Sequence, residues 1–313
     1  MALDSNSSLV EVGLCGIATY LESFPTARIV ATNTIIIIFD MFLAIFTVII
    51  NVLFISTYLN NRILQNTSNL LLVVLAMSDI FVGLLAQPMA IIRAVMEILG
   101  THNCTLFNIS RLVIIFCSGL SFLTIIVITH DRYIAIYHPL RYPVLFSKQN
   151  IKIIGIGCGM LLIGLLVCRV ILPLEIFFLI ICSLTFYTTL SALVVYTRIL
   201  CAARRQNIQI RNMARTSQFY RPTISLHEIK TTQVMVYVLG AMILCYYPGT
   251  CFWIYSAYHG YTFESLYTIV PYLELAVFLN SAINPVTYLL RSRSIRGAFL
   301  RHVNELFASE YRA

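Results

Sequence analysis

Long apolar stretches follow one another along the chain and are separated by short polar segments. Seven of them are long enough to cross a bilayer as helices, because a helix rises about 1.5 Å per residue and a bilayer core is roughly 30 Å thick. A transmembrane β-barrel would instead show apolar and polar residues alternating along each strand. The pattern therefore predicts an all-α fold, a seven-transmembrane helix bundle. Its expected spans are 31–58, 67–97, 105–136, 151–173, 175–202, 229–257 and 266–290.

The composition agrees with a membrane protein. Of the 313 residues, 59% are hydrophobic and only 11% are charged, and the mean hydropathy is +0.86. A soluble domain carries about 25% charged residues. The net charge of +8 would suggest nucleic acid for a soluble chain, but in a membrane protein the distribution of positive charge matters more than its total. We therefore expect no nucleic-acid partner.

The lysines and arginines set the expected orientation. Only Arg28, Arg93, Arg111 and Arg169 fall on the N-terminal side of the bundle or in the halves of spans nearest to it. The other basic residues lie at or beyond the opposite ends of the spans, and cytoplasmic loops carry the excess of positive charge. The chain is therefore expected to be a multi-pass protein of the plasma membrane, with an extracellular N-terminus and a cytoplasmic C-terminus.

The flanking regions complete the predicted organisation. Residues 1–30 are expected to form an extracellular N-terminus, 31–290 the seven-transmembrane domain, and 291–313 a cytoplasmic amphipathic helix and short tail. In this last region apolar residues alternate with basic ones, a pattern typical of a helix lying on a membrane surface, so membrane lipids are expected partners. The extracellular parts carry three expected glycosylation acceptors, Asn6, Asn103 and Asn108.

The third span ends in Asp131-Arg132-Tyr133, after an apolar stretch, 113–129, that contains no charged residue. An arginine at the inner edge of a membrane helix usually pairs with an acid or awaits a partner. The helix then ends before Pro139, which is followed by a basic loop. Asp131-Arg132-Tyr133, with Pro139-Leu140 downstream, resembles the rhodopsin-like class (class A) of G-protein-coupled receptors.

This resemblance implies a receptor that transmits binding of an extracellular ligand to a heterotrimeric G protein, with arrestin as a further partner. We expect no enzyme, because the chain shows no Ser/His/Asp set, phosphate loop or metal-ligand spacing. The nine cysteines follow no metal-binding pattern, and the pairing of Cys15 and Cys104, both outside the spans, is left open. The alternative from another class is an ion-coupled transporter with Asp79 as relay, but the inverted repeats of such proteins are missing.

The fourth and fifth spans are separated by little more than Pro173. Such a near-absent second outer loop resembles that of the melanocortin receptors, within a wider cluster that contains adenosine, cannabinoid and lysolipid receptors. The acidic positions that hold peptide and calcium in melanocortin receptors read here as Met89, Phe107 and Arg111. The scaffold is therefore melanocortin-like, whereas the ligand is expected to differ.

Several polar residues are expected at one depth near the middle of the membrane. A carboxylate among hydroxyls and amides there can form a structural hydrogen-bond cluster, a proton-sensitive switch or a cation site. The positions match the sodium pocket of the resembled family, which implies Na+ as an allosteric ion and no other metal or cofactor. The predicted sodium site comprises Asp79, Ser121, Asn280, Ser281 and Asn284.

An inner switch is expected where Arg132 meets the sixth span. Glu228 lies about 30 Å before Pro248 along that helix, at its cytoplasmic end, and can face Arg132. An arginine–carboxylate pair between two helices would hold the bundle closed, and its rupture would open a groove for a G protein. By resemblance, two inner tyrosines swing in on opening. The predicted switch residues are Asp131, Arg132, Tyr133, Tyr196, Glu228, Pro248, Pro285 and Tyr288.

The middle of the sixth span is predicted to kink at Pro248, because proline removes a backbone hydrogen bond. Members of the resembled family usually carry tryptophan where Tyr246 stands, and phenylalanine where Met242 stands. The hinge is therefore present with an altered trigger.

The expected ligand cavity lies in the outer half of the bundle. Ile114 stands where amine receptors carry their aspartate, and Phe278 where opsins carry the retinal lysine. Glu274 either pairs with Arg93 or Arg111, or faces the cavity and receives a cationic ligand group among aromatic rings. A small cationic ligand is slightly favoured here, with a peptide or a lipid as the alternative. The predicted ligand-binding residues are Glu274, Asp40, Arg111, Tyr246 and Trp253.

Overall fold

The computed structural model describes residues 10–14, 17–21, 25–101, 104–214, 226–260 and 262–310. Within these residues, seven helical segments are long and apolar enough to cross a membrane, which confirms the predicted seven-helix bundle. Most spans are one helix: α1 (Ala27–Asn60), α4 (Cys104–Tyr137), α6 (Lys148–Ile171), α7 (Leu174–Ala214) and α8 (Leu226–His259). The second combines α2 (Thr67–Phe81), the π-helical η2 (Val82–Ala86) and α3 (Gln87–Ile98), and the seventh α9 (Phe263–Thr268) and α10 (Val270–Arg291).

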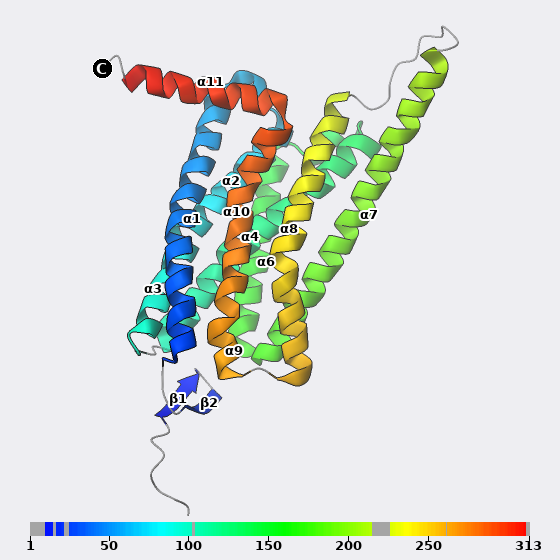
Figure 1. Cartoon of the computed structure of the whole chain (residues 1–313). Helices are drawn as coiled ribbons and strands as arrows, with labels where there is room; N and C mark the ends of the chain where they lie inside the picture. The colour runs from blue at the N-terminus through cyan, green and yellow to red at the C-terminus, as the bar shows by residue number, and fades with distance from the viewer. Residues whose placement is uncertain are drawn as a thin grey trace, which may run out of the picture.

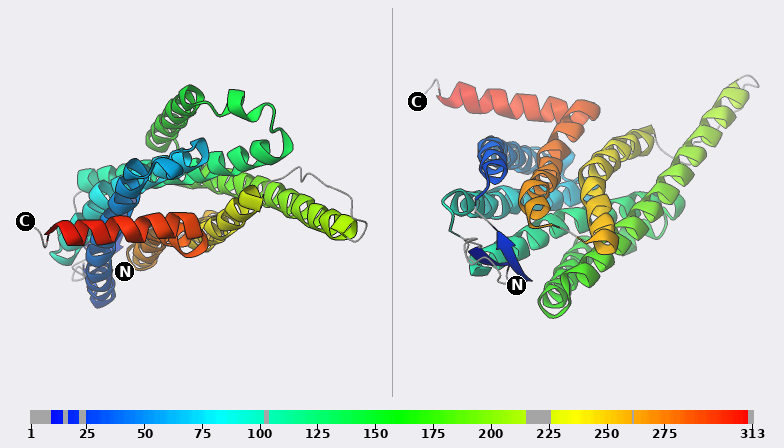
Figure 2. Two further views of the ribbon diagram at one scale, coloured as in Figure 1. Left: turned by 90° about the horizontal axis from the view of Figure 1, so that it is seen from above. Right: turned by 60° about the horizontal axis from the view of Figure 1, so that its bottom comes forward.

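The spans surround α4, which contacts α2, α3, α6, α7 and α8, while α1 contacts both α2 and α10 (Figures 1 and 2). Short helices connect some of the spans, namely η1 (Arg62–Leu64) and α5 (Tyr142–Leu145). Large apolar side chains such as Phe42 of α1 and Phe186 of α7 are exposed on the outside of the bundle. A bilayer is the solvent that suits such a surface, because lipid tails are as apolar as these side chains.

The amphipathic segment after the seventh span forms α11 (Arg293–Glu310), which lies across the end of the bundle (Figure 1). Ser56 Oγ of α1 lies 2.7 Å from His302 Nε2 of α11, so a hydrogen bond ties this helix to the first span. The opposite end carries an antiparallel hairpin of β1 (Val10–Leu14) and β2 (Ile17–Leu21), next to α1 and α3. The sequence did not predict this hairpin. The two ends are called the α11 end and the hairpin end below.

The second span is not one regular helix. Pro88 stands at the beginning of α3 and has no N–H to donate to the preceding turn, so the wider turns of η2 absorb the missing hydrogen bond. At η2 the backbone comes close to α1: a Cβ on Gly83 would lie 2.7 Å from Val48 Cγ2 and 3.3 Å from Ala44 O. Glycine therefore permits the close contact between the first and second spans.

Two connections differ in how well they were predicted. Only Leu172 and Pro173 separate α6 from α7, as expected from the near-absent loop. By contrast, α7 continues to Ala214, well past residue 202, and α8 begins at Leu226, so much of the predicted polar loop 203–228 is helical. Charged residues are good helix formers, and their polarity did not reveal that the helix extends beyond the bilayer.

Candidate functional site

A cavity of about 300 Å³ lies in the half of the bundle nearer the hairpin end, between α4, α6, α7, α8 and α10. Its walls are mostly hydrocarbon and aromatic, and include Ile114, Leu162, Phe177 and Val277. Its charged residues are Arg111 and Glu274, and its other polar groups are hydroxyls such as those of Ser118, Thr185 and Thr250. A largely apolar hollow with a few convergent polar groups is the usual form of a small-molecule site.

The base of the cavity is closed by Tyr246 of α8. Its hydroxyl donates a 3.1 Å hydrogen bond to the Ser118 carbonyl oxygen of α4, and its ring lies 5.2 Å from that of Phe122. This tyrosine takes the place of the usual tryptophan and joins the sixth span to the central helix. Because the Tyr246 side chain is part of the cavity wall, a ligand that displaces it would also move α8 relative to α4.

Trp253 forms another part of the wall. Its ring stacks on Phe178 of α7 with centroids 3.6 Å apart and planes 4° apart, and it meets Phe252 edge-on. Stacked aromatic rings of this kind stabilise the contact by about 0.5–1.5 kcal/mol beyond area burial. The predicted residues Tyr246 and Trp253 therefore both line the cavity, in company with Arg111 and Glu274.

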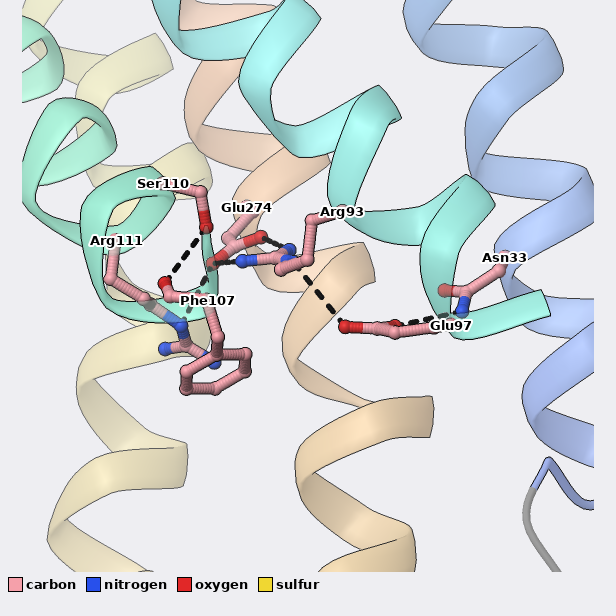
Figure 3. A network of polar contacts seen from close by, with 7 residues as sticks. All are labelled: Asn33, Arg93, Glu97, Phe107, Ser110, Arg111 and Glu274. Atoms are coloured by element: carbon pink, nitrogen blue, oxygen red, sulfur yellow. Dashed lines mark hydrogen bonds and ion pairs between the residues drawn. The ribbon is translucent and has the colours of Figure 1, made fainter. Parts of the chain in front are cut away.

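Glu274 of α10 stands between two arginines (Figure 3). Arg93 of α3 reaches it with both terminal nitrogens, one at 3.4 Å from Oε1 and the other in a shorter contact with Oε2. Arg111 of α4 approaches from the other side, with Nε 3.6 Å from Oε1. Of the two alternatives left open by the sequence, pairing of Glu274 is the one observed.

The network continues from Arg93 towards α1. Arg93 Nε lies 3.6 Å from Glu97 Oε1, one helical turn away, as the i,i+4 spacing predicts. Glu97 Oε2 accepts a 2.8 Å hydrogen bond from Asn33 Nδ2 (Figure 3). The Phe107 ring lies 5.0 Å from Arg111 Cζ and 5.8 Å from Arg93 Cζ, within range of cation–π attraction. Four charged side chains are thus held in fixed positions on three helices.

Asp40 does not belong to the cavity, which corrects its assignment as a ligand-binding residue. It is buried on α1, where its Oδ1 accepts a 3.2 Å hydrogen bond from Gln87 Nε2 of α3. The described residues that line the cavity come from α4 and the helices beyond it, and exclude Asp40. The position of Asp40 along the first span gives its depth in the membrane, but depth alone does not determine which way a side chain faces.

Asp79 is fully buried near the middle of the bundle, among the residues predicted to bind sodium. Ser121 Oγ donates to its Oδ1 at 2.7 Å, and Asn284 Nδ2 donates to its Oδ2 at 2.9 Å. Ser281 accepts a 3.2 Å hydrogen bond from Asn51 Nδ2 through its carbonyl oxygen. The structure therefore brings α2, α4 and α10 together around one carboxylate.

Several oxygens of this cluster are buried without a hydrogen-bond partner, including Asn280 Oδ1 and Asn284 Oδ1. Buried polar atoms are normally satisfied, so unsatisfied oxygens next to a carboxylate mark a place for a water molecule or a cation. Carboxylate, hydroxyl and amide oxygens are suitable ligands for Na+, and the predicted residues fit that ion. Among the described residues there is no group of three His, Cys, Asp or Glu side chains that could hold a metal.

Arg132 is buried at the α11 end, where its guanidinium pairs with Asp131. Arg132 Nε donates to Asp131 Oδ2 at 2.8 Å, and Tyr142 of α5 donates from its hydroxyl to Asp131 Oδ1 at 2.9 Å. The side chain of Glu228, the predicted partner of Arg132, lies outside the described residues. The described part of the switch is therefore an arginine held by a carboxylate that is itself anchored by Tyr142.

The other predicted switch residues lie near Arg132 or on the helices next to it. The buried hydroxyl of Tyr196 lies 3.5 Å from Thr129 Oγ1, while that of Tyr288 is buried without a partner and its ring packs 5.6 Å from Phe54. Tyr133 stacks on Tyr137 with ring centroids 4.9 Å apart. Both prolines lie within helices that continue past them, Pro248 in α8 and Pro285 in α10, so the kink expected at Pro248 stays a prediction.

Two of the three predicted glycosylation acceptors, Asn6 and Asn103, lie outside the described residues, as does Cys15. Asn108 is half-buried within α4. This placement weighs against glycosylation of Asn108, because acceptors normally stand in surface loops.

Sequence reasoning missed three contributors to the site: the carbonyl of Ser118, the ring of Phe178 and the cation–π contact of Phe107. A backbone acceptor gives no sequence signal, and the stacking of Phe178 on Trp253 depends on how α7 and α8 are rotated. Phe107 could have been found, since it stands one helical turn before Arg111.

Residues 50–288 match the model of the family "7 transmembrane receptor (rhodopsin family)". The rat histamine H2 receptor is 30% identical over 275 residues, which cover 80% of this chain and 74% of that receptor. The dog adenosine receptor A2a is 28% identical over 301 residues, covering 83% of this chain and 70% of the relative. The chain therefore belongs to the rhodopsin family of seven-transmembrane receptors and is a multi-pass protein of the plasma membrane.

Proposed function

We propose that this receptor converts occupancy of the cavity by an extracellular ligand into activation of a heterotrimeric G protein at the α11 end. The observation that carries the proposal is the buried Arg132, which pairs with Asp131 while Tyr142 anchors that carboxylate. An arginine that is buried in the closed arrangement of the helices can be exposed in an open arrangement. A ligand that binds the open arrangement more tightly shifts the equilibrium towards it.

The path between the two ends runs through α4 and α8. Tyr246 of α8 contacts Ser118 of α4 at the cavity base, and Pro248 lies half a turn further along the same helix. A helix is weakened at an internal proline, so a small displacement at Tyr246 can become a larger movement of the α11 end of α8. That movement would act on Arg132, which lies on α4 at the same end.

The orientation follows from the same proposal. The hairpin end faces the outside of the cell and receives the ligand, whereas the α11 end faces the cytoplasm, the G protein, arrestin and the lipids of the inner leaflet. The distribution of lysine and arginine supports this arrangement. The amphipathic α11, lying across the bundle, is the form expected of a helix in a membrane interface.

We further propose that Na+ binds at Asp79, with oxygens of Ser121, Asn280, Ser281 and Asn284 available around it. The ion would supply the positive charge that a buried carboxylate requires. Because Asp79 is held by α4 and α10, an ion bound there stabilises the arrangement in which these helices are close.

The ligand class cannot be carried over from the relatives, because their names refer to histamine, an amine, and to adenosine, an uncharged nucleoside. The narrower resemblance to melanocortin receptors stays a prediction based on the two-residue connection between α6 and α7. A free carboxylate for a cationic ligand would have been Glu274, but both Arg93 and Arg111 already engage it. The ligand is considered further below.

The proposed function is tested by basal nucleotide exchange on G proteins in membranes containing the receptor. Arg132→Ala is expected to abolish exchange, because it removes the group that the open state presents to the G protein. Glu228→Ala is expected to raise exchange by removing the predicted restraint on Arg132. Arg62→Ala, which changes an exposed arginine of η1, is the matched control and should behave like the parent. If the Arg132 and Glu228 variants both match the parent, the proposed switch is wrong.

A further inference from the structure

We propose that the ligand is a carboxylic acid with an apolar body, and that its carboxylate binds the guanidinium of Arg111. The proposal rests on the function proposed above, since it names the chemistry of the ligand in the same cavity. A carboxylate on a hydrocarbon occurs in two kinds of molecule, a compact aromatic acid and a fatty acid.

The coordination of Arg111 is incomplete. Its Nε is buried and has no hydrogen-bond partner, and its ion pair with Glu274 is long, at 3.6 Å. The side chain itself is only 11% exposed, so water does not surround it. An arginine has five N–H donors, and a buried charged donor without a partner is costly. The guanidinium is therefore prepared for a further acceptor, and a carboxylate matches its planar fork.

Arg111 lies in the wall of the cavity. Arg111 and Glu274 line the hollow, whereas Arg93 and Glu97 lie outside its wall. Arg93 is shared between Glu274 and Glu97 and is therefore occupied on two sides (Figure 3). Of the two arginines, Arg111 is the one that a ligand in the cavity can reach.

A cationic ligand group at the Glu274 carboxylate would be unfavourable. An ammonium group would have to displace one arginine from the carboxylate or lie beside both guanidiniums. Like charges about 4 Å apart repel by about 4 kcal/mol at an effective dielectric constant near 20. Displacement would leave a buried arginine without its partner, which is similarly unfavourable. An anion is attracted by both guanidiniums, and its repulsion by Glu274 is reduced because Arg93 keeps that carboxylate neutralised while Arg111 turns to the ligand.

The remainder of the cavity is mostly apolar. From Arg111 the hollow extends past Ile114 and Leu162 to Phe122 and Tyr246 at its base. The Tyr246 hydroxyl in this region donates to the Ser118 carbonyl oxygen, whereas the buried Ser118 hydroxyl has no hydrogen-bond partner among the described residues. A hydrocarbon chain or aromatic ring would fill this volume with favourable burial of about 25 cal/mol per Å². At the base a ligand would press on Tyr246, which joins α8 to α4.

The test measures binding by the thermal stability of the purified receptor in detergent, so it does not depend on any G protein. Two matched series are the probes: hydrocinnamate, hydrocinnamamide and phenylpropylamine for the aromatic source, and octanoate, octanamide and octylamine for the fatty source. At least one acid is expected to raise the melting temperature in a saturable manner, while the amide and amine of the same skeleton do not. Which acid acts identifies the source.

Three variants assign the effect to Arg111. Arg111→Gln should weaken binding of the active acid by about ten-fold or more, as expected for loss of a hydrogen-bonded charge pair. Arg111→Lys should retain part of the affinity, because it keeps the charge without the planar fork. Glu274→Gln should bind the acid as well as the parent or more tightly, since it frees Arg111 from its competing carboxylate. Arg28→Gln, which removes an exposed arginine that pairs with Glu264 at the hairpin end, is the control and should bind like the parent.

The proposal is overturned if no acid stabilises the parent, if an amine stabilises it where the acid does not, or if Arg111→Gln binds the acid as tightly as the parent. If Arg111→Gln does not fold, Glu274→Gln provides the test. Unchanged or tighter binding of the acid by Glu274→Gln supports the proposal, and loss of that binding rejects it. Failure of the receptor function is distinguishable, because acid binding with normal dependence on Arg111 but no nucleotide exchange would reject only the coupling to a G protein.

Discussion

At the scale of single residues, the carboxylate of Asp79 shows how the bundle holds a charge far from water. Its two oxygens accept from Ser121 and Asn284, and among the described residues no lysine or arginine forms an ion pair with it. Two neutral donors do not compensate a full negative charge in an apolar surrounding. The site therefore requires a cation or a proton, and unsatisfied amide oxygens next to it favour the cation.

We predict that sodium raises the thermal stability of the purified receptor relative to an equal concentration of N-methylglucamine, a cation too large for the site. A ligand bound only to the folded state stabilises it by about 2.7 kcal/mol at a concentration a hundred times its dissociation constant. Asp79→Asn should remove the difference between the two salts. An equal sodium effect in Asp79→Asn would place the ion elsewhere. Ser78→Ala, next to Asp79 but bonded only to the Leu75 carbonyl oxygen among the described hydrogen bonds, is the control.

At the scale of elements, the second span has the most irregular backbone of the described spans, because η2 lies between α2 and α3. A π-helical turn changes the rotation of everything that follows it, so η2 sets the direction in which Arg93 and Glu97 point. The hydrophobic pattern predicted the span itself but not this change of register, because periodicity locates a helix without resolving one wide turn. Asp40 has a different explanation, because it lies on the regular helix α1, and its depth in the membrane did not determine which way its side chain faces.

The close contact of η2 with α1 gives a prediction based on one substitution at two glycines. Gly83→Ala places a methyl group 2.7 Å from Val48 Cγ2, and overpacking of this kind costs about 1–3 kcal/mol. Gly157→Ala, on the exposed side of α6 with nothing within 4 Å, should be neutral or stabilising by up to about 1 kcal/mol through helix propensity. The melting temperature should therefore fall in purified Gly83→Ala and stay the same or rise in purified Gly157→Ala. Similar shifts in both would mean that Gly83 is not a contact requirement.

At the scale of the whole molecule, the proposed direction of signalling runs from the hairpin end to the α11 end. It is based on the distribution of basic residues between the two ends. Composition and periodicity were sufficient to predict seven spans and the helix α11 that follows them, because a bilayer demands long apolar helices. They were not sufficient for the ligand site, where the pairing of Glu274 depends on three helices meeting at one level. The hairpin of β1 and β2 also escaped prediction, since each strand has only five residues, far fewer than the apolar runs that mark the spans.

The proposed orientation predicts which end of the receptor antibodies can reach on intact cells. An epitope added before Met1 should be labelled without permeabilisation, and one added after Ala313 only after permeabilisation, because basic residues stay in the cytoplasm. A glycosidase should increase the gel mobility of the parent and of Asn108→Gln equally, since Asn108 lies within α4. The reverse labelling pattern would overturn the orientation.

The two-residue connection between α6 and α7 also affects how long a ligand stays bound. Two residues cannot fold over the cavity and close it after the ligand enters, so this connection adds no conformational step to arrival or departure. Residence time would then be set by the broken contacts themselves, and affinity differences would appear mainly in the dissociation rate. A receptor built this way follows rises and falls in ligand concentration promptly and retains little memory of an earlier exposure.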